Sequence, residues 1–241
     1  MDLSDDELDE REWSRVTDTT PADELHVYGE HALDPDWARL VASARYAVIE
    51  HVWVEHWFAD EGDDFAPWLS LFAAHPPPAL TSLQVGGYAD RSRRAHLGPV
   101  APTLAACPLT SLGLCGRLDS VQPLRSASLR ELSFKTDDAV DAVASLLARS
   151  ELPDLRFLTV SAPGRAALLA PHLTRLVEVE LVGLSLDAAF FEALPGPARP
   201  GRLELETCWW PEDLEDEEAA RAACERLDGV EVFAPEEGRC L

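Results

Sequence analysis

Basic residues and long apolar runs are both scarce in this chain of 241 residues, and each shortage excludes a class of protein. Lys and Arg total 20 against 44 Asp and Glu, and Lys135 is the only lysine. A net charge of -24 repels phosphate, so we expect no binding to nucleic acid or to anionic membranes. The three arginines between Arg91 and Arg94 are interpreted as a solvated turn.

The chain also lacks the marks of export and of membrane insertion. It has no apolar run of 18 residues, and its first ten residues are acidic where a secretory signal needs a basic start and an apolar centre. These absences predict a cytoplasmic protein.

The motifs of common enzymes and metal sites are missing as well. There is no GxSxG, no glycine-rich phosphate loop followed by Lys and Ser or Thr, and no CxxC pair. The five cysteines are therefore predicted to be reduced and mostly buried. Glu24, His26, His51 and Glu55 are of the types that bind zinc, but no known ligand spacing supports a site. We expect a non-enzymatic protein with no metal and no cofactor.

What the chain does contain is a repeated pattern: an apolar residue, two variable ones, an apolar residue, one variable and a final apolar residue. Clear copies begin at Leu80, Leu109, Leu129, Leu155 and Leu176. Weaker copies begin at residues 22, 49, 200 and 227, so nine units follow one another at intervals of 20 to 31 residues. In an extended strand the apolar set of such a unit points to one side and the variable set to the other.

This pattern and its spacing resemble the leucine-rich repeat family, in a divergent and irregular form of bacterial type. The resemblance covers residues 22–233 and implies an α/β solenoid of about nine units, with a curved parallel sheet on the concave face and helices or turns on the convex face. The family places Asn or Cys three residues after the last apolar position. Only Cys208 matches that place by type, with Asp137 as a substitute, so irregular units are expected.

The solenoid should occupy residues 22–241, preceded by an acidic tail or cap over residues 1–21. Helices are predicted from Asp34 to about Ala44, around residues 65–72, and after Asp137 or Asp138 and Asp187. Residues 97–107 favour a short helix, and residues 118–124 favour a turn or 3₁₀ segment. A capping helix is expected at residues 211–227, with its acidic residues in the first turns.

The variable positions of the strands give the candidate binding surface. Aligned unit by unit, they are aromatic or histidine at the N-terminal end, small in the middle and acidic at the C-terminal end. The predicted partner-binding residues are His26, Tyr28, His51, Trp53, Glu55, Phe157, Glu178, Glu180, Glu204, Glu206 and Glu231. Trp53 is either an exposed anchor or covered by the N-terminal tail.

These positions favour a scaffold-type module that binds another protein, one with a basic surface, through its concave face. An alternative is an acidic inhibitor or immunity-type protein that blocks a nuclease or toxin by imitating nucleic acid. An enzyme with a site built from loops ranks behind both.

Overall fold

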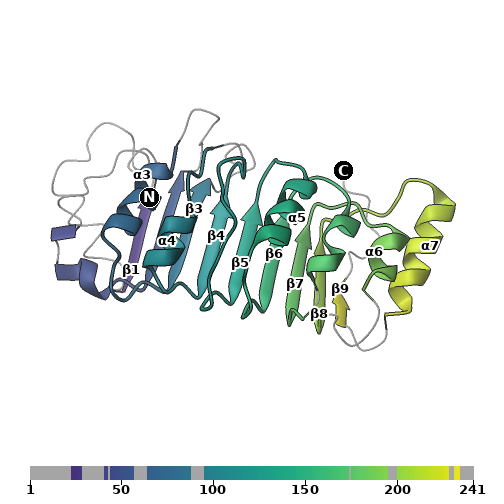
Figure 1. The fold of residues 1–241 in the computed structure, drawn as a ribbon. Helices are drawn as coiled ribbons and strands as arrows, with labels where there is room; N and C mark the ends of the chain where they lie inside the picture. The colour runs from purple at the N-terminus through teal and green to yellow at the C-terminus, as the bar shows by residue number, and fades with distance from the viewer. Residues whose placement is uncertain are drawn as a thin grey trace, which may run out of the picture.

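The fold is α/β, with one parallel sheet whose strand order follows the chain (Figure 1). The computed structural model describes residues 23–28, 41–42, 44–56, 64–87, 95–173, 175–194, 200–227 and 231–233. Within them lie nine strands: β1 (Glu24–Tyr28), β2 (His51–His56), β3 (Ser82–Gly87), β4 (Ser111–Cys115), β5 (Glu131–Lys135), β6 (Phe157–Ser161), β7 (Glu178–Val182), β8 (Arg202–Glu206) and β9 (Glu231–Phe233). The α/β class is confirmed. The predicted tail 1–21, the start of the first helix, the Arg91–Arg94 turn and Cys240 lie outside the described residues.

Alternation of side chains along each strand separates a buried face from an open one. In β3 the inward Leu83 and Val85 are buried, while the outward Ser82 and Gln84 keep contact with solvent. The same alternation recurs in β4 to β8. We call the surface made by the outward residues the open face.

The helices that follow the strands cover the opposite, apolar face. Figure 1 shows α3, α4, α5 and α6 on one side of the sheet. The described helices are η2 (Ala44–Val48), α3 (Ala66–Ala74), α4 (Ala101–Ala106), α5 (Val140–Arg149), η4 (Ala166–Leu168), η5 (Ala170–His172), α6 (Ala188–Glu192) and α7 (Leu214–Glu225). None of the helices in this part of the chain is both long and apolar enough to cross a membrane.

The predicted aromatic helix is fully buried on its apolar face. Phe65, Trp68, Leu69 and Phe72, which share one face at helical spacing, are all inaccessible to solvent. The hydroxyl of Thr103 in α4 donates to the carbonyl oxygen of Leu69 at 2.8 Å. A buried polar group thus gains a partner and joins neighbouring units.

The later helices correct some sequence expectations. Helix α7 begins at Leu214 instead of residue 211 because the Asp213 carboxylate caps it, accepting from the backbone N–H of Glu215 at 2.9 Å. Asp138 does not cap α5. It accepts from the N–H of Leu118 at 2.6 Å, in the preceding unit, and Ala139 stands at the N-cap without a side-chain bond. Residues 118–124 form a turn without a helix, as the short interval predicted.

Backbone hydrogen bonds stack the units where each strand begins, in place of a complete side-chain ladder. The residue before a strand donates to the carbonyl oxygen at the matching place of the preceding unit. The pairs, at 2.7 to 3.0 Å, are Thr81 to Glu50, Thr110 to Thr81, Arg130 to Thr110, Arg156 to Arg130, Val177 to Arg156 and Gly201 to Val177. Cys208 adds one side-chain link, since its thiol donates to the Leu181 carbonyl oxygen at 3.2 Å.

Candidate functional site

The strand register aligns the outward residues in three rows across the open face. The first row contains Glu24, His51, Ser82, Ser111, Glu131, Phe157, Glu178, Arg202 and Glu231. The middle row contains His26, Trp53, Gln84, Gly113, Ser133, Thr159, Glu180 and Glu204. The third row contains Glu55, Gly86, Cys115, Lys135, Ser161, Val182 and Glu206. The predicted unit-by-unit alignment of these positions is confirmed.

At the N-terminal end, Trp53 contacts two imidazole rings. Its ring centroid lies 4.3 Å from that of His26 in a stacked arrangement and 5.7 Å from that of His51. Nε2 of His26 is 3.2 Å from a carboxylate oxygen of Glu24. Trp53 is half-buried, so it still presents part of its ring on the open face. The side chain of the predicted Tyr28 lies outside the described residues.

Glu55 departs from the expectation of an exposed contact residue. It is only 7% exposed, and it accepts a hydrogen bond at Oε1 from Nε2 of Gln84 on the next strand at 2.5 Å. Burial raises the pKa of the Glu55 carboxyl, and the charges of Lys135 and His26 oppose that rise. Glu55 is therefore a supporting residue beneath the surface.

Two small residues, one of them Gly86, stand between Glu55 and Lys135, which lies three strands away. Gly86 has a φ of +127°, and a Cβ added to it would lie 1.7 Å from the carbonyl oxygen of Cys115. Only glycine fits this place. The row between Glu55 and Lys135 therefore holds only Gly86 and Cys115, both small.

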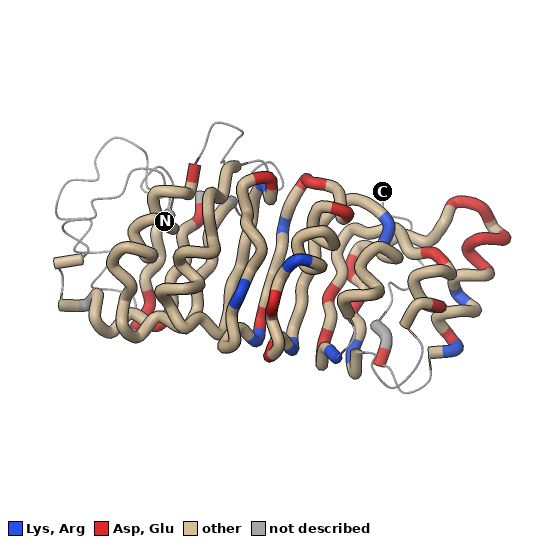
Figure 2. The backbone as a smooth tube through the Cα atoms, viewed as in Figure 1, with Lys and Arg blue, Asp and Glu red and all other residues tan. Residues whose placement is uncertain are grey.

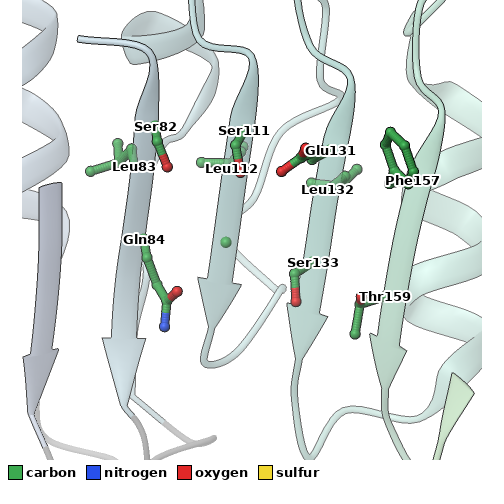
Figure 3. Close-up of a pocket in the computed structure, with 11 residues that line it drawn as sticks. Ser82, Leu83, Gln84, Ser111, Leu112, Glu131, Leu132, Ser133, Phe157 and Thr159 are labelled. Carbon is green, nitrogen blue, oxygen red and sulfur yellow. The ribbon is translucent and has the colours of Figure 1, made fainter. Parts of the chain in front are cut away.

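The middle of the open face is hollowed. Strand β4 presents Ser111 and Gly113 between the longer Gln84 of β3 and Glu131 of β5, which leaves a hollow of about 300 Å³ (Figure 3). We call this the central hollow. It is lined by Ser82, Leu83, Gln84, Ser111, Leu112, Gly113, Glu131, Leu132, Ser133, Phe157 and Thr159. Of the predicted binding residues, only Phe157 belongs to it. For the other outward residues of the hollow, the signal in the sequence was the run of small variable positions on the middle strands.

At the C-terminal end, carboxylates outnumber cations. Arg202 bridges two of them, with Nη1 3.1 Å from Glu178 Oε1 and Nη2 3.2 Å from Glu204 Oε2. Glu180 accepts from the Thr159 hydroxyl at 2.9 Å, and Glu206 is exposed. With Glu231 on β9, these residues form what we call the acidic end: Glu178, Glu180, Glu204, Glu206 and Glu231 around Arg202.

The structure does not bring the four potential metal ligands considered in the sequence together as one cluster. Among the described residues, Asp23, Glu50 and His51 are the group of three whose ligand-type atoms all lie within 4.8 Å of one another. Asp23 and Glu50 lie just before β1 and β2, at the rim of the sheet. The four described cysteines form no disulfide. Three are buried, Cys224 is half-buried, and burial raises the pKa of Cys107 and Cys208 to about 11.

Comparison with known proteins adds information on the fold alone. No protein-family model matches the chain, and no curated protein matches it. Its structure is similar to the crystal structure of a structural-genomics target from Bacteroides fragilis, with a TM-score of 0.59 and 12% sequence identity. The match covers 92% of this chain and 78% of the other. At such low identity the likeness concerns the path of the chain and carries no function.

Proposed function

We propose that this chain is a divergent leucine-rich repeat protein that binds another protein through its open face, with the acidic end favouring a basic partner surface. The repeat supports the assignment through its regular order: each copy supplies one parallel strand, and neighbours stack by backbone bonds at equivalent places. In such an array the open face of the sheet is the concave surface.

The observation that carries the proposal is the excess of carboxylate on a sheet face that the described helices leave open. In the acidic end, five carboxylates share the single guanidinium of Arg202. Charges that are incompletely compensated on one side attract an oppositely charged surface, speed its approach and restrict the choice of partner. A half-buried Trp53 at the other end supplies the type of aromatic residue that anchors interfaces.

The test is charge reversal on the open face. The variant Glu180→Lys with Glu204→Lys should bind the partner, captured from native lysate and then purified, at least about tenfold more weakly by calorimetry. Removing opposite-charge attraction and adding repulsion both act in that direction. The wild-type affinity should also fall as salt is raised, because screening shortens the range of the attraction.

The matched control places the same charge change on α7. Glu215→Lys with Glu218→Lys alters the net charge equally, and both residues are exposed on that helix, away from the open face. It should retain wild-type affinity. Equal loss in both variants would show that net charge alone governs binding, and undiminished binding by the first variant would contradict the role of the acidic end.

The same excess of carboxylate suits the second candidate, an inhibitor that occupies the nucleic-acid site of a nuclease or toxin. In that case the captured partner is itself a nucleic-acid enzyme. Its activity should be blocked by the wild type and restored by the variant carrying Glu180→Lys and Glu204→Lys.

A further inference from the structure

The central hollow has a different chemistry from the acidic end. Its floor is formed by Ser111 and Gly113 of β4, and taller side chains of β3, β5 and β6 stand around it. Hydroxyl groups and one amide dominate its outward side chains, with one carboxylate, Glu131, and one aromatic ring, Phe157. Figure 3 shows Glu131 extending from β5 toward β4, with Phe157 standing on the other side of β5's outward row.

The polar side chains that line the hollow all offer hydrogen-bond acceptors. Gln84 uses one of its two Nε2 hydrogens for Glu55, and its carbonyl oxygen remains able to accept from a ligand. The hydroxyls of Ser111 and Ser133 are each able to accept. Glu131 is exposed, and no ion pair to it occurs within the described part of the chain. A ligand that carries several N–H donors and a positive charge would satisfy this set.

Phe157 adds an apolar wall to these acceptors. It lies directly opposite Glu131 in the strand register and is 38% exposed, which is high for so large an apolar side chain. An exposed ring beside a carboxylate suits a group with an apolar stem and a charged head, since the stem packs on the ring while the head meets the acceptors.

We infer that the central hollow receives an arginine side chain of the partner protein. The guanidinium would lie above Gly113, with its donors toward Glu131, Ser111 and Ser133, and its stem against Phe157. Arginine fits better than lysine because its planar fork offers five donors, where an ammonium is a compact point charge. The inference rests on the proposed function, since it specifies what the partner places on the open face.

Gly113 gives the inference a steric test. A Cβ added there would lie 3.2 Å from Cγ of Gln84, a side chain that is able to move, and the glycine is not among those with positive φ. A long side chain at this position should therefore be tolerated by the backbone and fill the hollow. Gly113→Met removes the space and keeps every surrounding charge.

The experiment is an NMR titration of the full ¹⁵N-labelled chain with a capped pentapeptide, Gly-Gly-Arg-Gly-Gly, and its citrulline and lysine counterparts. The arginine peptide should shift amide signals of β3 to β6. Glu131→Gln should weaken it about fivefold, the scale of one charge-assisted contact, and Gly113→Met should abolish the shifts. The citrulline peptide, of the same shape but uncharged, should cause none, and the lysine peptide should bind at least about threefold more weakly.

The control is Glu218→Gln, which removes one exposed carboxylate from α7, away from the open face, and should leave the titration unchanged. Shifts concentrated on β7 to β9, or indifference to both Glu131→Gln and Gly113→Met, would overturn the arginine site. Equal affinity for the lysine peptide would overturn the selectivity for arginine. Neither result contradicts the proposed function, which is tested separately by the partner affinity of the variant with Glu180→Lys and Glu204→Lys.

Discussion

Glu55 and Glu206 occupy the same outward row of the sheet but have opposite surroundings. Glu206 is exposed, whereas Glu55 is buried and accepts a hydrogen bond from Gln84. The charge of Lys135, beyond two small residues, opposes the rise of the Glu55 pKa. Strand alternation predicts the same direction for both side chains, and it fails to predict which one is buried. That difference involves contacts distant in sequence, since the Gln84 that donates to Glu55 lies 29 residues away.

We predict that Glu55→Gln stabilises the protein at neutral pH by about 1 kcal/mol, because the amide keeps an acceptor for Gln84 without a buried charge. The pKa of Glu55 is raised in the folded state, so its stability contribution is complete below the ordinary value of 4.5 and is lost as pH rises through the folded pKa. The benefit of the substitution should therefore grow as pH rises.

Urea unfolding of wild type and Glu55→Gln from about pH 5 to about pH 8 measures this trend, in a range above the sequence pI of about 4.5. Glu206→Gln is the control and should give no comparable trend. An advantage that shrinks toward alkaline pH would contradict the assignment of a destabilised carboxylate.

At the scale of the element, the sequence predicts the start of one helix correctly and that of another wrongly. Asp187 caps α6 as expected, accepting from the N–H of Phe190 at 2.9 Å. Asp138 has the same sequence signal but bonds Leu118 in the unit before it, so α5 begins without a cap. A capping signal depends on the local sequence alone. Whether an aspartate instead accepts a hydrogen bond from a neighbouring unit depends on how the units stack.

Asp187→Ala should lower the free energy of unfolding by about 1 kcal/mol, the usual cost of losing an N-cap. The cause is the loss of the shorter of two bonds from the Phe190 N–H, which keeps only the Asp187 carbonyl oxygen at 3.2 Å, at the start of a helix whose Phe190 and Phe191 are buried. Asp187→Asn keeps a capping oxygen and should remain within about 0.3 kcal/mol of wild type. Urea denaturation compares the three proteins, and equal losses in both variants would assign the effect to charge instead of capping.

At the scale of the whole molecule, charge acts on stability and on binding in opposite directions. The chain carries a net charge of -24, with acid concentrated in residues 1–64 and 176–241, and Figure 2 shows acidic residues gathered on α7. Like charges repel one another in the folded state, and salt screens that repulsion. The attraction proposed for the open face is screened by the same ions.

We therefore predict that raising NaCl from about 0.02 to about 0.5 M increases the melting temperature of the free chain while it weakens partner binding. Differential scanning calorimetry and isothermal titration over the same salt series give the two slopes. Sucrose, which stabilises without screening charge, is the control for general solvent effects and should leave the affinity nearly constant. A melting temperature that falls with salt would indicate that the ion pairs outweigh the repulsion.

The sequence by itself determined the strands, their order and the direction of their side chains, because an apolar pattern of period two fixes which face of a strand is buried. It also showed the small positions of the middle strands and the acidic positions of the last ones. The tertiary structure decided what these positions become. Stacking turned Ser111 and Gly113 into the floor of a hollow, buried Glu55 beside Gln84 and placed Arg202 between two carboxylates. Those outcomes depend on contacts across strands that are distant in sequence, which no local pattern contains.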